Sequence, residues 1–280
     1  MPQSGKKRAH LRETARDHPE YREILSLFQE LYAHIEGKED ATGIALTFPD
    51  RHAAQKIRGG LPLLAPESLS VDTDRAVRFL SGILAVLRRA GRQGEEELAR
   101  IEQSIAEGAL DVGALLGACL RRDRGALTEA ARSISVQSSL LAFVLEVPLK
   151  TALERVAESI DPETVGEWKE GYCPVCGSRP GMDELVGEEG KRFLSCSSCF
   201  FRWPFKRLKC PYCGNEDPGT LSYFLAGDGP TRVDVCRKCS RYIKTRDSRK
   251  GHADVPLEAE DLATLHLDLL AEREGFERGR

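Results

Sequence analysis

The cysteine spacing restricts the fold of this chain more than any other feature of the sequence. Eight of the nine cysteines form four Cys-x-x-Cys pairs between residues 173 and 239. Each pair closes a tight turn whose backbone amides point at the sulfurs, so two facing pairs offer four thiolates at tetrahedral spacing. Nineteen residues separate the first two pairs and 22 the last two, room for a short hairpin in each case, whereas 10 residues join the middle pairs. Sequential pairing therefore predicts two metal sites. Their ligands are Cys173, Cys176, Cys196 and Cys199 in the first site and Cys210, Cys213, Cys236 and Cys239 in the second.

The ligand set leaves the metal open. Four thiolates suit zinc and a mononuclear iron of rubredoxin type equally well, and ligation of an iron–sulfur cluster is chemically possible. Zinc would have a structural role, because it has no redox chemistry, whereas iron would add a redox function. The sequence thus predicts two metal ions, iron or zinc, one in each four-cysteine site.

An even number of paired cysteines is also typical of secreted scaffolds held by disulfides. The N-terminal residues MPQSGKKRAHLRETARDHPEY contain no apolar stretch of the roughly 7 to 15 residues that a secretory signal needs. The most apolar segment, SSLLAFVLEVPLK, is interrupted by Glu146 and Pro148, and no run of about 18 apolar residues occurs. We therefore expect a cytoplasmic protein with reduced thiols and no membrane insertion.

The composition changes along the chain. Up to about residue 165 it is rich in Leu, Ala, Glu and Arg, with apolar residues at helical spacing over 21–36, 72–90, 95–120 and 127–160. Beyond the Asp161-Pro162 step, which disfavours helix continuation, aromatic, Gly and Cys residues dominate. We predict a helical domain at 1–165, four-cysteine modules at 166–207 and 208–250, and a C-terminal helix at 251–280. Residues 47–70 are expected to be extended, with one helical turn.

The cysteine pairs repeat in a fixed order. The first and third, CPVCG and CPYCG, have Pro after the first Cys and Gly after the second, and CSSCF and CRKCS lack that Gly. Gly tolerates the positive φ that the turn past the second ligand commonly needs. The repeated order supports sequential pairing and indicates an internal duplication. The predicted fold class is a helical domain followed by two small β modules of rubredoxin or zinc-ribbon type, each dependent on its metal for stability.

The remaining reactive residue types give no catalytic pattern. Cys119 lies among apolar neighbours in GALLGACLRR and is interpreted as a small core residue. The six histidines show no metal-ligand spacing, and no Ser-His-Asp or Gly-rich phosphate motif accompanies them. We therefore expect a binding protein rather than an enzyme, with no small-molecule substrate.

Two other functions fit parts of the second half. Cys210-Pro-Tyr-Cys213 matches the dithiol motif of glutaredoxins, which would indicate an oxidoreductase. Seven Lys and Arg residues between 237 and 250, beside Tyr242, would suit a zinc ribbon that binds nucleic acid. Thiolates nearby would offset much of that positive charge, and the net charge of −3 indicates no general affinity for polyanions.

The chain from about 168 to 278 resembles the formate dehydrogenase accessory proteins of the FdhE type. The resemblance lies in CPVCGSRP, RFLSCSSCFFRWPFKRLKCPYCG, VDVCRKCSRYIKTRDSRK and DLATLHLDLLAEREGFER, with Trp203 four residues after Cys199. All eight paired cysteines coincide with metal-binding positions of that family. The resemblance implies a cytoplasmic maturation factor for formate dehydrogenase, with a helical domain and two rubredoxin-like modules, that contacts the catalytic subunit. On this basis Arg241, Tyr242 and Lys244 are predicted to contact the partner, on loops that the metal sites hold in place.

Overall fold

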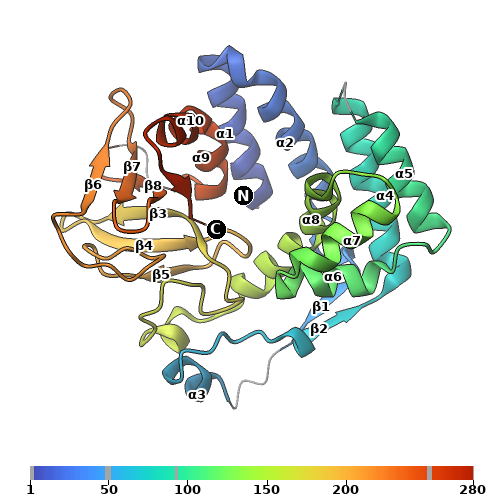
Figure 1. The fold of residues 1–280 in the computed structure, drawn as a ribbon, viewed down its shortest axis with the longest axis horizontal. Coiled ribbons are helices and arrows are strands. Elements are labelled where there is room, and N and C mark those ends of the chain that lie inside the picture. The colour runs from blue at the N-terminus through green and yellow to red at the C-terminus, as the bar shows by residue number, and fades with distance from the viewer. Residues whose placement is uncertain (1–2, 48–51, 92–93, 251–253, 280) are drawn as a thin grey trace. The chain divides into compact units, whose positions relative to one another are not determined.

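A computed structural model describes residues 3–47, 52–91, 94–250 and 254–279. The chain divides into two compact units. The helical unit consists of Met1–Arg8, Ala15–Phe48 and Leu64–Val156, and the sheet unit consists of Ala9–Thr14, Pro49–Leu63 and Ala157–Arg280. Figure 1 shows the fold of both, coloured along the chain.

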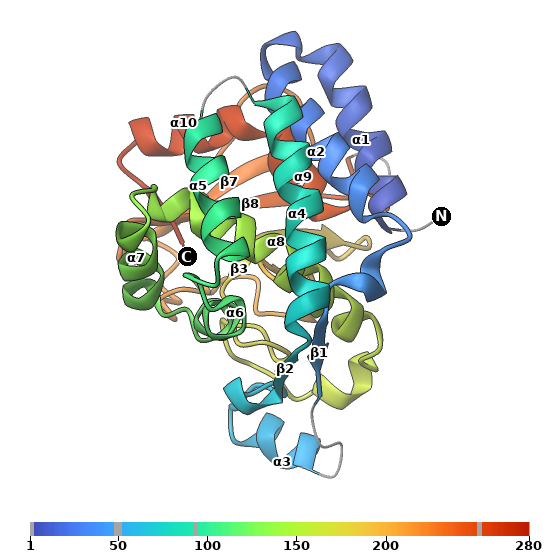
Figure 2. The same cartoon turned by 90° about the vertical axis from the view of Figure 1, so that its right-hand side faces the viewer.

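The helical unit is built from amphipathic helices and one short ladder. The helices are α1 (Gln3–Asp17), α2 (Arg22–Ile35), α4 (Thr73–Ala90), α5 (Glu95–Ala106), α6 (Val112–Arg121), α7 (Arg124–Ser133) and α8 (Ser138–Glu158). Strand β1 (Ile44–Leu46) pairs antiparallel with β2 (Leu69–Val71). Helix α4 lies beside α2 and α5, as Figure 2 shows, and buries Leu80, Ile83 and Leu84.

The predicted helices at 21–36 and 72–90 are present, but those at 95–120 and 127–160 are each broken in two. Gly108 has φ +70°, and Asp111 then caps α6 by accepting a hydrogen bond from Ala114 N. Ser135, at φ +55°, separates α7 from α8. The connector after β1 contains α3 (Ala53–Arg58) and a 3₁₀ turn at Pro66–Ser68, and its residues 48–51 lie outside the described ranges. Helix α1 was not predicted.

The sheet unit contains one sheet of seven strands. They are β3 (Pro180–Val186), β4 (Lys191–Cys196), β5 (Arg202–Pro204), β6 (Leu221–Phe224), β7 (Thr231–Cys236), β8 (Arg241–Asp247) and β9 (Glu277–Arg278). The order is β5-β4-β3-β8-β7-β6, with β9 beside the start of β8. The turn formed by each Cys-x-x-Cys pair is called a knuckle. Each cysteine quartet lies at the ends of three successive antiparallel strands, so the same order of knuckle, hairpin, knuckle and strand occurs twice.

The two three-stranded halves join into a single sheet. Strand β3, the first of its half, pairs parallel with β8, the last of the other, through Met182 to Leu185 against Lys244 to Asp247. The two metal modules therefore share backbone hydrogen bonds instead of forming separate sheets.

Two helices cover one face of this sheet. The predicted single C-terminal helix is divided into α9 (Leu257–Ala263) and α10 (Leu265–Arg273), because the backbone of Thr264 leaves the helical region at φ −118° and ψ 37°. The core under α10 consists of Val233, Val235, Tyr242, Leu267 and Ala271. Among the described residues no single helix is both long and apolar enough to cross a membrane, although α7 and α8 together, bent by 115°, meet the criteria of length and composition.

Candidate metal centres

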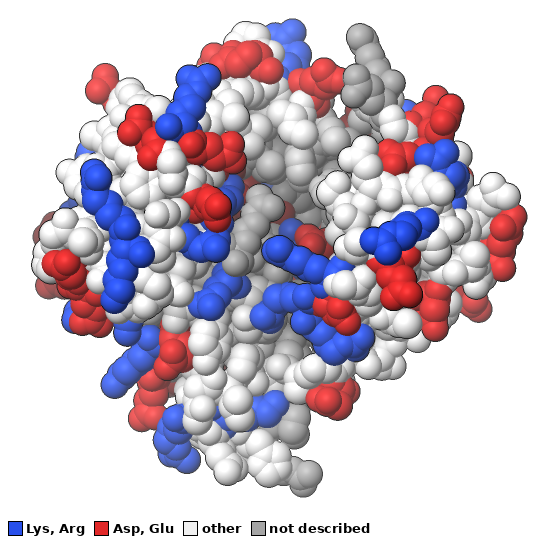
Figure 3. Space-filling model, in the orientation of Figure 1, with Lys and Arg blue, Asp and Glu red and all other residues white. Residues whose placement is uncertain are grey.

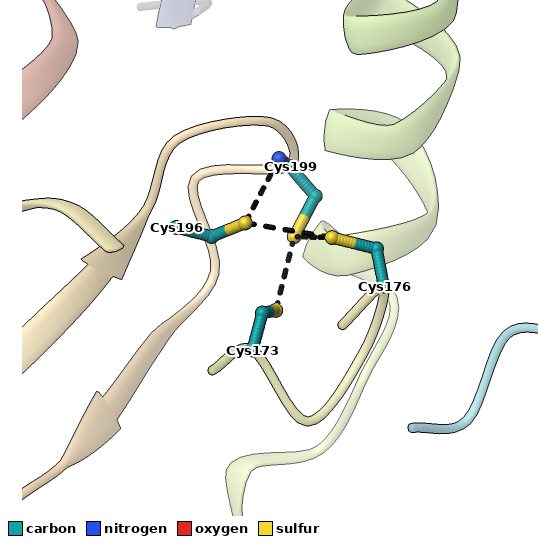
Figure 4. Close-up of side chains that lie close together, drawn as sticks. All are labelled: Cys173, Cys176, Cys196 and Cys199. Atoms are coloured by element: carbon teal, nitrogen blue, oxygen red, sulfur yellow. Dashed lines mark hydrogen bonds between the residues drawn. The ribbon is translucent and has the colours of Figure 1, made fainter. Parts of the chain in front are cut away.

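The first cysteine quartet brings its four sulfurs together as predicted. In Figure 4, Cys173 and Cys176 face Cys196 and Cys199 across a small interior space. The Sγ atoms of Cys173 and Cys199 lie 3.4 Å apart, those of Cys176 and Cys196 also 3.4 Å, and those of Cys176 and Cys199 3.6 Å. All four side chains are buried.

These distances fit a tetrahedral metal site. Sulfurs held about 2.3 Å from a central ion stand about 3.8 Å apart, close to the observed separations. A disulfide would require about 2.05 Å, and all nine cysteines are unbonded to one another. Four thiolates in this arrangement would bind zinc or iron, and the distances do not distinguish the two metals.

The backbone around each knuckle is shaped for the sulfurs. Val175 N donates to Cys173 Sγ, and Ser198 N and Cys199 N donate to Cys196 Sγ. The residue after the second cysteine has a positive φ in all four knuckles. These residues are Gly177, Phe200, Gly214 and Ser240, at +72°, +58°, +71° and +53°. The turn thus needs the left-handed conformation whether or not glycine is present, and Phe200 and Ser240 adopt it at some local cost.

The buried thiols of the first site do not titrate alike. Burial raises the pKa of Cys173 and of Cys199, because a thiolate there loses its hydration. Hydrogen bonds with Cys173, Cys196 and Cys199 lower the pKa of Cys176 despite its burial. A cation among the sulfurs would stabilise the remaining thiolates.

The second quartet has the same arrangement but is more open. Cys210 and Cys239 sulfurs lie 3.7 Å apart, as do those of Cys213 and Cys236. Cys213 is exposed and Cys239 half-buried, whereas Cys210 and Cys236 are buried. The Asn215 amide donates to Cys236 Sγ over 3.6 Å. One side of this site therefore faces solvent.

The geometry of Cys210-Pro-Tyr-Cys213 differs from that of a redox dithiol. A glutaredoxin-type thiol needs a lowered pKa at a helix N-terminus. Here the segment forms a turn that leads into no helix, and burial raises the pKa of Cys210 to about 11. Cys119 is half-buried in α6, where burial raises its pKa to about 12, so neither position carries an activated thiol.

The structure places two of the three predicted partner residues in the interior. Tyr242 and Lys244 are 1% and 0% exposed. Lys244 Nζ lies 2.7 Å from carboxylate oxygens of both Asp261 and Asp268, and Tyr242 donates its hydroxyl to Asp268 over 2.7 Å. A partner cannot reach either side chain in this fold. Arg241 is half-exposed, and its guanidinium donates to Arg278 O.

This buried polar cluster was not predicted. Arg278, near the chain end, completes it by pairing with Asp268 over 2.9 Å and with Asp261. Partial burial acts to raise the pKa of Asp261, but the nearby charges of Lys244 and Arg278 lower it overall. The sequence contained a signal for it, since YIKTR and DLATLHLD both belong to the resemblance. Those segments meet because α9 and α10 pack on the sheet.

The comparisons agree with the cysteine geometry. Family models match residues 172–207 as the FdhE central domain and residues 208–280 as the FdhE C-terminal domain. An FdhE homolog of Aquifex aeolicus is 37% identical over 145 residues, half of this chain and half of that protein. An FdhE homolog of Rhizobium meliloti is 26% identical over 91% of this chain and 88% of its own length.

A solved structure extends the similarity to the helical unit. The crystal structure of the FdhE protein from Pseudomonas aeruginosa matches with a TM-score of 0.67 and 25% identity, over 98% of this chain and 93% of that one. The likeness to this structure therefore covers the helices as well as the sheet that carries the cysteine quartets of this chain. Residues 172–280 match the central and C-terminal domains of FdhE, and over nearly its whole length the chain is similar to FdhE proteins in sequence and fold.

Proposed function

We propose that this protein is a cytoplasmic formation protein for formate dehydrogenase, which binds the catalytic subunit of that enzyme through its metal-held sheet unit. The observation that carries the proposal is the pair of complete cysteine quartets on one shared sheet, within both cysteine-bearing domains of FdhE. The eight paired cysteines would hold two metal ions, iron or zinc, with one ion in each quartet. Reduced thiolates suit the cytoplasm.

The arrangement favours a binding role over catalysis. The cysteines would be used up as metal ligands, and the ions, closed off by four sulfurs each, would have no open position for substrate. What the metals supply is rigidity, because a small module cannot bury enough apolar surface to fold alone. The surface loops between the strands are then held in fixed positions for a protein partner.

The nucleic-acid alternative loses its main support. Of the basic residues between 237 and 250, Lys244 and Arg246 are buried, and Arg249 pairs with Asp247. On the face drawn in Figure 3, Lys and Arg are scattered among Asp and Glu. The net charge of −3 likewise gives the molecule as a whole no general attraction for polyanions.

The test is anaerobic capture of tagged protein from its host during growth on formate. We expect the catalytic subunit of formate dehydrogenase to co-purify with the wild type and not with Cys176→Ser, which removes one ligand of the first site. A host lacking the protein should lose formate dehydrogenase activity. Capture of nucleic acid instead of the subunit, or full activity in the deleted host, would contradict the proposal.

A further inference from the structure

A groove lies beside the second cysteine quartet, and metal binding does not explain its presence. Its volume is about 230 Å³, and it lies on the sheet face opposite α9 and α10, below the loop that joins the two modules. Its floor includes Ile243 and Leu185, and its walls include Tyr212 and Tyr223. This volume is below the roughly 300 to 1,000 Å³ of typical small-molecule sites, so it suits one or two side chains of a larger ligand.

The rim of the groove is apolar and exposed. Leu208 and Tyr223 line it and are 55% and 57% exposed. Leu225, at 49%, follows directly after the end of β6, two residues beyond Tyr223. These three exposed side chains are half of the large exposed hydrophobic residues recorded for the described chain. Such a concentration is typical of an interaction site.

Basic residues predominate in the groove lining, which contains five of them and one acidic residue, Asp234. Ion pairs offset part of this charge, because Arg192 pairs with Asp183, Lys209 with Glu216 and Arg241 with Glu277. Arg232 pairs with Asp234 and stacks over the ring of Tyr223 at 4.2 Å. Within the described ranges Arg207 has no carboxylate partner, and its guanidinium donates to the backbone oxygen of Glu189 over 3.4 Å. A second metal site with four thiolates would offset part of this charge but would lie at one end, at Cys210 and Cys236.

The strand along the groove has an open edge. Strand β6 ends the sheet, and no strand of the described chain pairs with its outer side. The hydrogen bond from Arg237 N to Thr220 O shows that every second residue of β6, counted from Thr220, directs its N–H and C=O groups toward β7. Leu221 and Tyr223 therefore point their N–H and C=O groups outward, where an extended chain could pair with them.

We propose that this groove binds an extended peptide by adding it as a strand to β6. The peptide would place a bulky apolar residue in the groove and an acidic residue two positions away, facing Arg207 and Lys209. Main-chain bonds to β6 give affinity in this mode, and the groove gives specificity. The inference rests on the proposed function in one respect: the peptide is a segment of the immature catalytic subunit.

The test measures binding of overlapping 12-residue peptides that tile the catalytic subunit, each compared with a copy in which Asp and Glu are replaced by Lys. Two variants address the groove. Tyr223→Pro removes an outward N–H that only an added strand would use, at an edge position where proline is tolerated. Arg207→Glu with Lys209→Glu reverses the charge, and Arg22→Glu with Arg121→Glu is the matched control on exposed cations of the helical unit. Each variant is checked for two bound metals.

We expect acidic, apolar peptides to bind the wild type and the control, and to bind the charge variant about tenfold more weakly. Tyr223→Pro should lose binding, and Tyr223→Ala, which keeps the N–H, should retain part of it. If Tyr223→Pro fails to fold, the variant Arg207→Glu with Lys209→Glu still decides whether the groove binds the peptide. If no peptide binds these variants more weakly than the control, the proposal that the groove binds a peptide is wrong, even if the whole subunit is captured. Peptide binding at the groove without capture of the subunit would instead contradict the proposed function alone.

Discussion

The sulfur atoms of the two cysteine sites differ in accessibility. No ligand of the first site is more than 6% exposed, whereas Cys213 is exposed and Cys239 half-buried. Metal exchange requires a ligand to be displaced from the ion, which is easier from the solvent side. The two ions should therefore differ in lability although their ligand sets are identical.

A chelator with a thiol reagent should release the two metals in separate phases. We expect the second site to empty on the order of tenfold faster, with Cys213 modified before any ligand of the first site. Stopped-flow absorbance and mass mapping of the modified cysteines measure this. Cys119→Ser removes the ninth thiol as a control, and a single phase of two equivalents would show the sites to be equivalent.

Lys244 belongs to the interior and not to the partner surface. Lys244→Met would remove the fully buried cation that Asp261 and Asp268 share with Arg278, and should lower the free energy of unfolding by about 1 to 3 kcal/mol. Urea denaturation measures the loss, and the exposed Lys238→Met is the control. Unchanged stability with weakened binding of the catalytic subunit would restore Lys244 to the partner surface.

The same cluster makes stability depend on pH. The folded pKa of Asp261 is lowered, so the stabilisation it brings is complete above its ordinary value of about 3.9 and is lost as pH falls through the folded value. We expect the free energy of unfolding to drop below about pH 4, and to drop less in Asp261→Asn. Urea titrations at matched metal content compare the two. Parallel curves would exclude Asp261 as a source of the acid sensitivity.

At the scale of elements, the knuckles and strands were predictable and their joining was not. Cysteine spacing determines which sulfurs meet, and the residue types of KRFLSC (191–196) and RYIKTR (241–246) are typical of short strands, which the structure has at 191–196 and 241–247. The parallel pairing of β3 with β8 leaves no local signal, since about 60 residues separate the partners. Burial of Tyr242 and Lys244 follows from the packing of α9 and α10 on the sheet. The segments YIKTR and DLATLHLD mark the residues involved, but neither segment shows that the two pack together.

The absence of a side chain at Gly171 allows the backbones of the two modules to approach each other closely. A Cβ at Gly171, before the first knuckle, would stand 1.9 Å from the backbone oxygen of Pro211 in the third. Backbone cannot move aside as a flexible side chain can. The chain entering the first module is therefore fitted to the second.

Gly171→Ala should destabilise both metal sites together by more than the roughly 1 kcal/mol expected of an unobstructed glycine in a positive-φ turn. Gly187→Ala is that control, with φ +67° and no atom within 4 Å of the added Cβ. Metal content and thermal unfolding of each variant measure the difference. Equal effects would indicate that the two knuckles separate without cost.

At the scale of the molecule, the two units have independent sources of stability. The helical unit has its own apolar core, including Leu80, Ile83 and Leu116, whereas the sheet unit surrounds both cysteine quartets. The sequence predicted this contrast through composition. The sequence could not predict that residues Ala9–Thr14 of α1 group with the sheet unit, because nothing in that short helical segment indicates which residues it packs against.

Removal of both metals should therefore unfold one unit and spare most of the other. We expect Cys176→Ser with Cys213→Ser to retain most of the helical far-ultraviolet signal while residues 170–250 become sensitive to protease. Limited proteolysis followed by mass spectrometry locates the cuts. Cys119→Ser is the control, and complete loss of helical signal would mean that the units fold as one.

The parallel pairing of β3 with β8 has a consequence for synthesis on the ribosome. Leu185, at the end of β3, pairs with Asp247 and is synthesised 62 residues before it. At about 5 to 20 residues per second, that interval is roughly 3 to 12 s. During this time the inner edge of β3 is unprotected, and a ribosome stalled within the second module would leave it so. Production of this protein should then be sensitive to translation speed between codons 185 and 247, independently of the final stability of the fold.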